Sequence, residues 1–162
     1  MKLNKTQLLL FCITVTLMFL NCNLEGSRDM KAVKNMLAAN GMSTDLARAI
    51  ASNYKNEGVG SIGIQQHKEF KKITDDIGEL TKLMDLNLNY NGIEEISEKI
   101  ALCTSLVMIE LVGNNLKRLP DGICNLHNLE VLELRANALE YLPDSIGKLQ
   151  KLRELSLQRN KL

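Results

Sequence analysis

The chain has 162 residues, of which 45% are hydrophobic, so it is long enough for one domain with a substantial buried core. Only 4% of the residues are aromatic and tryptophan is absent, so aliphatic side chains must fill the interior. The formal net charge is +1, and after removal of Lys2 and Lys5 the balance is 18 basic to 19 acidic side chains, which argues against nucleic acid as a partner.

Residues 1–21 are predicted to form a secretory signal peptide. Lys2 and Lys5 precede a mostly apolar run from Leu8 to Leu20. The run is too short for a helix that crosses a bilayer, which needs about 20 residues. No small residues at the usual spacing mark an ordinary cleavage site after the run.

The apolar run ends at a cysteine. Phe19-Leu20-Asn21-Cys22 resembles a bacterial lipoprotein signal, although the common form has glycine or alanine directly before the cysteine. The resemblance implies that Cys22 is diacylated, that residues 22–28 form a lipidated tether, and that the protein is exported and anchored in the bacterial cell envelope or on the outer surface. Acyl chains hold a soluble domain on a membrane at about 0.8 kcal/mol per buried methylene. A plain signal peptide or an uncleaved anchor remain as alternatives.

Residues 29–58 carry two helical patterns, separated at Gly41 and ending at Gly58. The apolar residues at helical spacing are Met30, Val33, Leu37 and Ala38, then Leu46, Ile50 and Tyr54. We interpret this segment as a helical N-terminal cap, because a solenoid exposes its core at an uncovered end. A small recognition module is the alternative, and no motif supports it.

Residues 83–162 repeat the pattern LxxLxLxxNxLxxLPxxIGxLxx every 23 residues. Position 1 of the repeat is Leu83, Leu106, Leu129 and Leu152; position 9 is Asn91, Asn114, Asn137 and Asn160. The repeats are predicted to be 83–105, 106–128, 129–151 and a truncated fourth at 152–162. Residues 59–82 are predicted to be a glycine-rich loop and a degenerate half-repeat, because counting back one period places Gly60 and Gly63 where leucines belong, whereas Phe70, Ile73, Ile77 and Leu80 fit.

This pattern resembles the leucine-rich repeat family, in the 23-residue LPxxIGxL subclass. The resemblance implies an α/β leucine-rich repeat solenoid, with a parallel concave β-sheet, convex short helical turns and the N-terminal helical cap. Pro120 and Pro143 exclude a strand on the convex side, and Ser97 in the place of proline predicts a looser return there. The asparagines at position 9 are predicted to be structural, because a buried amide there can bond the backbone of two coils.

The candidate ligand-binding residues lie on the concave sheet. Strand alternation places positions 3, 5 and 7 on the open face. An apolar centre with a polar rim predicts a protein-binding patch, made of Tyr90, Met108, Glu110, Val112, Val131, Glu133 and Arg135. A solvated sheet face is the alternative. Glu110 and Glu133 are neighbours that could act as acid and base, but an open sheet offers no pocket to desolvate them.

The cysteines of the repeats have ordinary structural explanations. Cys103 replaces a buried leucine, and Cys124 stands where small residues recur. Together with His127 they make a weak metal signal, and the spacing leaves a Cys103–Cys124 disulfide open. No cofactor motif is present, so no cofactor and no metal are predicted.

The sequence therefore predicts an exported, membrane-anchored lipoprotein that binds a protein or another macromolecule through its concave sheet, without catalysis. Two alternatives are the N-terminal part of a secreted effector enzyme of the ligase type and an intracellular signalling scaffold. The last repeat ends halfway round, at Leu162. This ending predicts either a fragment of a longer array or self-association through an uncapped C-terminal repeat.

Overall fold

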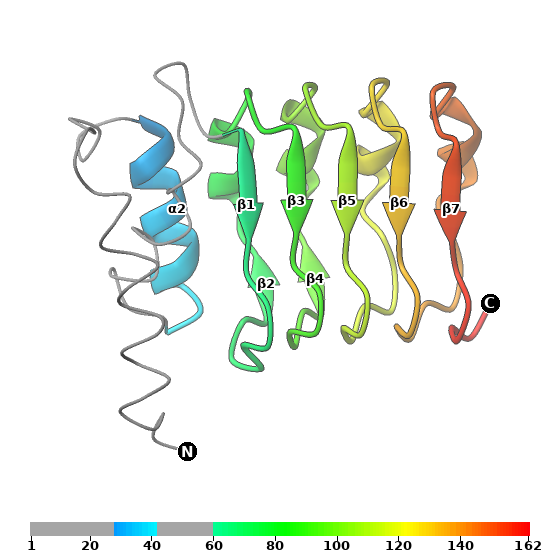
Figure 1. The fold of residues 1–162 in the computed structure, drawn as a ribbon, viewed down its shortest axis with the longest axis horizontal. Coiled ribbons are helices and arrows are strands. Elements are labelled where there is room, and N and C mark those ends of the chain that lie inside the picture. The colour runs from blue at the N-terminus through cyan, green and yellow to red at the C-terminus, as the bar shows by residue number, and fades with distance from the viewer. Residues whose placement is uncertain (1–27, 42–59) are drawn as a thin grey trace.

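A computed structural model describes residues 28–41 and 60–162 of the chain (Figure 1). The predicted signal peptide, Cys22 and the second half of the predicted helical cap lie outside the described residues. Within the described ranges, no helix is long and apolar enough to span a membrane.

The main sheet has five parallel strands that follow one another along the stack (Figure 1). They are β1 (Ser61–Gly63), β3 (Asp85–Asn87), β5 (Met108–Glu110), β6 (Val131–Glu133) and β7 (Glu154–Ser156). The pairing holds the repeat period, since Leu86 lies beside Ile109, Ile109 beside Leu132, and Leu132 beside Leu155. The predicted solenoid with a parallel sheet is therefore confirmed.

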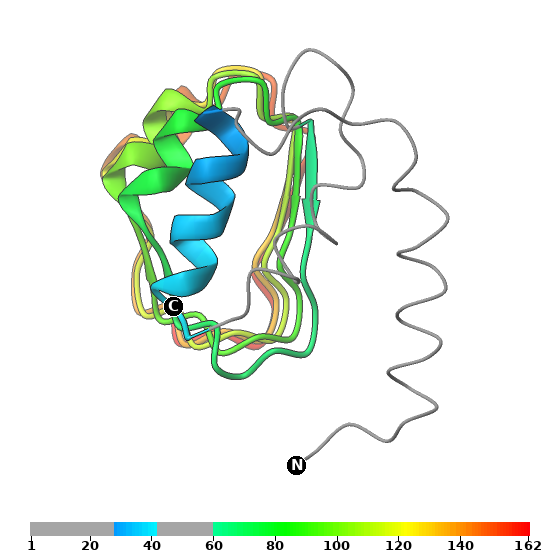
Figure 2. The ribbon, with the colours of Figure 1, turned by 90° about the vertical axis from the view of Figure 1, so that its left-hand side faces the viewer.

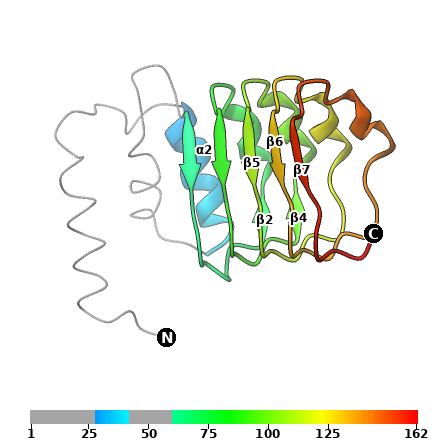
Figure 3. The same ribbon diagram turned by 45° about the vertical axis from the view of Figure 1, so that its right-hand side comes forward.

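The opposite side of the stack is built from 3-10 helices (Figure 3). They are η3 (Asp75–Glu79), η4 (Glu98–Leu102), η5 (Asp121–Asn125) and η6 (Asp144–Lys148). Each follows an extended residue at the same repeat position, namely Thr74, Ser97, Pro120 or Pro143. These are the predicted short convex turns, and their tight winding lets each coil return within one repeat.

A second, two-stranded sheet lies on the return path, where β2 (Lys72–Ile73) pairs with β4 (Glu95–Ile96). Ser97 follows β4 and donates its backbone N–H to the Ile73 oxygen at 2.9 Å, a bond that proline in its place could not make. Ser97 also caps η4, since its hydroxyl accepts from the Lys99 N–H at 3.0 Å and donates to Asp75. The prediction of a looser return at Ser97 was wrong, because the serine adds hydrogen bonds that the prolines lack.

The glycine-rich loop predicted at the start of residues 59–82 contains a strand instead, because β1 pairs with β3 along its whole length. Ile62 lies beside Leu86, 24 residues later, and Ile64 is buried like Leu88. Ile73, by contrast, pairs with Ile96, 23 residues later, which is the regular repeat period. One extra residue between Ile64 and Ile73 therefore shifted the count back from Leu83 and concealed the first strand.

The core is a stack of aliphatic side chains between the two sides of each coil. The four residues predicted to fit the first coil are fully buried: Phe70, Ile73, Ile77 and Leu80. Their equivalents in the later coils, such as Leu116, Ile123 and Leu126, are buried in the same way. Burying such a side chain stabilises the fold by about 1.5–3 kcal/mol, so the stack itself supplies most of the driving force for folding.

Helix α2 (Arg28–Ala38) covers the N-terminal end of the stack and packs on η3 (Figure 2). Its buried face consists of Ala32, Val33, Met36 and Leu37. The helix ends before Gly41, whose φ of +69° favours glycine, as the sequence indicated. Asn40 joins the helix to the first coil: its amide donates to the Met36 and Lys72 oxygens and accepts from the Lys71 and Lys72 N–H groups, all at 2.8–2.9 Å.

Candidate functional site: the concave sheet

The apolar centre of the concave face is formed by Met108 and Val131, which are register partners on β5 and β6. Both side chains are half-buried, as is Val112, which lies two residues beyond the end of β5. Met108 and Val131 stand on adjacent strands, about 4.8 Å apart, so these two side chains form one small apolar surface, and Val112 lies about 13 Å further along the same face. The inward-facing residues of the same strands, Ile109 and Leu132, are buried in the core.

Tyr90 lies apart from this centre, in the turn that follows β3. It has a φ of +56°, and its equivalents Gln66, Gly113, Ala136 and Arg159 share this left-handed conformation. The Tyr90 ring covers Gly113, because a Cβ on that glycine would lie 2.6 Å from the ring. Tyr90 therefore extends the open face at the edge of the sheet, with 57% of its surface exposed, and packs on a turn rather than on Met108.

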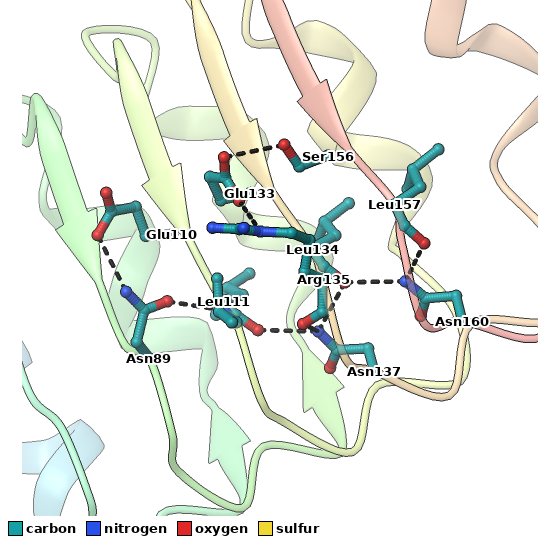
Figure 4. A network of polar contacts seen from close by, with 11 residues as sticks. Asn89, Glu110, Leu111, Glu133, Leu134, Arg135, Asn137, Ser156, Leu157 and Asn160 are labelled. Carbon is teal, nitrogen blue, oxygen red and sulfur yellow. Dashed lines mark hydrogen bonds and ion pairs between the residues drawn. The ribbon is translucent and has the colours of Figure 1, made fainter.

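The two carboxylates of the face are bound to different partners (Figure 4). Glu110 accepts from the side-chain amide of Asn87 and from that of Asn89, the latter at 3.0 Å. Glu133 accepts from the Arg135 guanidinium at 2.9 Å and from the Ser156 hydroxyl at 2.9 Å. The amides and Ser156 are partners that sequence reasoning missed, although their positions in the repeat could have suggested them.

Only 8% of the Glu133 surface is exposed, and this burial alone would raise its carboxyl pKa. The hydrogen bonds from the Ser156 hydroxyl and the Arg135 guanidinium, with the Arg135 charge, outweigh burial and lower the pKa below its ordinary value of 4.5. The folded protein therefore favours the ionised form of Glu133. Such a group suits a fixed negative charge on a binding face better than a proton donor.

Stability should consequently depend on pH through Glu133. The pKa of Glu133 is lower in the folded state than in the unfolded state. The ionised carboxylate therefore contributes stability that is fully present above the unfolded-state pKa near 4.5 and is lost as pH falls through the folded-state pKa. We expect Glu133→Gln to lose less stability than the wild type between pH 7 and pH 3, measured by urea unfolding. An identical pH dependence in both proteins would contradict the assigned pKa shift.

The asparagines of position 9 form a ladder through the turn beside the sheet (Figure 4). In each case the amide nitrogen donates to one backbone oxygen of its own coil and one of the preceding coil, as Asn137 does to Leu134 at 3.0 Å and Leu111 at 2.8 Å. The amide oxygen accepts from the preceding coil, as with the Leu116 N–H at 3.1 Å. The same bonds are made by Asn91, Asn114 and Asn160. The ladder fixes the register of the strands that carry the site.

Cys103 and Cys124 are both buried and both free thiols, so the disulfide that the spacing left open does not form. Cys103 donates to the Ile77 oxygen at 3.0 Å. Across residues 28–41 and 60–162, no three histidine, cysteine, aspartate or glutamate side chains are placed to share a metal ion. His127 is exposed.

The reactivity of Cys103 should be very low in the native protein. Burial raises its pKa to about 12, so almost no thiolate, the reactive form, is present at pH 8. We expect iodoacetamide to leave Cys103 unmodified in the native chain at pH 8 and to alkylate it in urea, as read by peptide mass mapping. Rapid alkylation of the native thiol would show that the first two coils open readily.

The convex side has an open depression lined by Glu98, Asp121, Cys124, Asp144 and Lys148, among others. The Glu98 carboxylate is already bound by the next coil, since the backbone N–H groups of Asp121 and Gly122 donate to it at 3.2 and 2.7 Å. This contact ties η4 to η5. At its Glu98 side the depression therefore serves the stacking of the coils.

A parallel sheet, stacked 3-10 helices and an asparagine ladder together define a leucine-rich repeat solenoid. The protein-family model described as "Leucine-rich repeat region" matches residues 62–161, and the chain belongs to this family. No curated protein matches the chain significantly.

Several solved structures are similar to the chain. A leucine-rich repeat protein of Leptospira interrogans is 31% identical, with a TM-score of 0.58, over 61% of this chain and 25% of its own. A chain of the BIR3–SERK2 complex of Arabidopsis thaliana is 26% identical, with a TM-score of 0.55, over 66% of this chain and 60% of its own. The ectodomain of the Arabidopsis receptor kinase SOBIR1 shares the fold at 20% identity and a TM-score of 0.66, over 82% of this chain and 80% of its own. The chain thus spans a quarter of the length of the Leptospira protein.

Proposed function

We propose that the protein binds a protein ligand through the concave sheet. The observation that carries this proposal is the half-buried apolar pair of Met108 and Val131, with Val112 further along, on a sheet face that no described element covers. Polar and charged groups surround it, as at protein interfaces, where an apolar centre contributes most of the binding energy. The similarity to a chain of the BIR3–SERK2 complex supports a protein as the partner.

The role is inferred to be binding without catalysis. Glu110 and Glu133, the pair that could have acted as acid and base, are each held by hydrogen bonds to other side chains. Their rigid placement on an open face provides fixed negative charge for recognition. General acid and base groups instead need a pKa close to the working pH, and that of Glu133 is shifted away from it.

The proposed contact makes a direct prediction for the double variant Met108→Ala/Arg135→Ala. The partner is first purified by its affinity for the immobilised wild-type chain, and equilibrium affinities for both chains are then compared by biolayer interferometry. We expect binding to weaken at least tenfold, because truncating residues in the centre of an interface costs about 1–2 kcal/mol each. The unfolding transition should keep its cooperativity, since both side chains lie on the open face.

Retained affinity in the double variant would move the binding site off the concave face. A matched control is Lys117→Ala/Arg118→Ala, a pair of exposed residues on the return side of the coil, where we expect no change. Sedimentation of the wild-type chain alone tests the self-association that the sequence analysis left as an expectation.

We also propose that the protein is exported and lipid-anchored at Cys22. The support is in the sequence: two lysines, an apolar run and a cysteine directly after it. The anchor would present the concave sheet outside the cytoplasm. The intact mass of the protein from the membrane fraction of its native host tests this, and a chain that begins at Cys22 with added acyl groups is the expected result. The mass of the unprocessed chain would contradict it.

A further inference from the structure

The concave sheet carries a row of four side chains that differs from the rows beside it. Register pairing places Asp85, Met108, Val131 and Glu154 next to one another across β3, β5, β6 and β7. The apolar pair is thus flanked on each side by a carboxylate, and both carboxylates are exposed. Among the described residues, neither forms an ion pair with lysine or arginine, unlike Glu130, which meets Arg153 at 3.2 Å.

The adjacent row adds to the negative charge. It contains Glu110 and Glu133 and no cation. Arg135, two residues beyond the end of β6, already binds Glu133 and lies four residues beyond the Asp85 row, about 13 Å along the strand direction. The two rows together hold four carboxylates around two apolar side chains, so the face attracts a cationic ligand.

The spacing of the row specifies the shape of that ligand. Three strand intervals separate Asp85 from Glu154, about 14 Å at the usual 4.8 Å between strands. An extended segment advances about 3.4 Å per residue, so residues i and i+4 are also about 14 Å apart, and residue i+2 faces the same side. A basic residue at i, an apolar residue at i+2 and a basic residue at i+4 would then meet Asp85, the Met108–Val131 pair and Glu154 together.

We propose that the ligand is an extended protein segment with the pattern basic-x-apolar-x-basic, which crosses the strands along the Asp85 row. This inference rests on the proposed function and names the chemistry of its partner. The pattern reads the same in both chain directions, so either polarity of the segment fits. Recognition depends on the 14 Å separation of the carboxylates, which adjacent basic residues could not bridge.

Three nine-residue peptides of glycine and serine test the pattern. The first carries Lys, Leu and Lys at i, i+2 and i+4; the second carries the same residues with the two lysines adjacent; the third carries glutamate for lysine. Fluorescence anisotropy of labelled peptides with the full chain gives the affinities. We expect the first peptide to bind at least fivefold more tightly than the second, and the third not to bind. Higher salt should weaken the first complex.

Two charge-neutralising variants complete the test. Asp85→Asn/Glu154→Gln should weaken binding of the first peptide about tenfold, because two exposed ion pairs are lost. Asp121→Asn/Asp144→Asn removes the same charge from the convex side and should leave the affinity unchanged. Equal affinity for the first two peptides, or an equal effect of both variants, would overturn the inference.

The failure of this inference can be told apart from the failure of the proposed function. If the peptides fail this test but the purified partner still loses affinity for the Met108→Ala/Arg135→Ala variant, the proposed function stands while this inference fails. If neither the partner nor any peptide depends on the concave face, both fail.

Discussion

Replacing Asn114 by leucine is expected to destabilise the protein by about 2–4 kcal/mol. The Asn114 amide is buried, donates to the Leu88 and Leu111 oxygens at 2.9 and 3.0 Å, and accepts from the Ile93 N–H at 3.0 Å. Leucine satisfies none of these three backbone groups, which lie in two consecutive coils. Urea unfolding followed by circular dichroism measures the loss.

The neighbouring asparagine provides a matched control for this prediction. Asn115 has the same chemistry but an exposed side chain, so Asn115→Leu should change the stability by no more than about 0.5 kcal/mol. Similar losses in both variants would mean that the position 9 ladder contributes no more than any polar surface residue, and would contradict its assigned role in register.

A second large effect is expected for Gly122→Ala, about 1–3 kcal/mol of lost stability. A Cβ on Gly122 would lie 2.5 Å from the backbone oxygen of Glu98 and 3.2 Å from the Ala101 Cβ. The Gly122 N–H also donates to the Glu98 carboxylate at 2.7 Å, so a shift of η5 away from η4 would break that bond as well. Thermal unfolding by calorimetry would show the loss.

Gly147→Ala makes the same substitution in the next 3-10 helix and is the appropriate control. No atom lies within 4 Å of a Cβ there, and neither Gly122 nor Gly147 has a positive φ. Gly147→Ala should be neutral or stabilise the protein by up to about 1 kcal/mol, because alanine restricts the unfolded chain. Destabilisation of equal size in both variants would assign the effect to backbone freedom instead of to contact with η4.

The regular part of the fold could be predicted from sequence because identical slots repeat at a fixed spacing. The leucines of positions 4 and 6 and the asparagines of position 9 each signal one environment. Where a coil departs from the period, the prediction was wrong: the extra residue before Ile73 moves Ile62 and Ile64 out of phase with the later repeats, and β1 was missed. The role of Asn40 was missed for a related reason, since a long-range hydrogen bond between a helix end and an edge strand leaves no periodic signal.

The candidate site could be predicted only as a set of positions. Alternation placed Met108 and Val131 on the open face, and the register of β5 and β6 brings them together. Repeat spacing carries no information on rotamers, however, and these decide that Glu110 turns to Asn89 while Glu133 turns to Arg135. The packing of Tyr90 on Gly113 likewise depends on a backbone turn of positive φ that the repeat pattern alone does not show.

Site-specific photocrosslinking tests the central claim most directly. A benzophenone amino acid replaces Met108 on the concave face in one variant and Ser145, in the convex helix η6, in the other. Both proteins are irradiated with the purified partner, and adducts are separated by mass. A concave binding site predicts an adduct at Met108 and none at Ser145. An adduct at Ser145 alone, or equal yields at both positions, would contradict it.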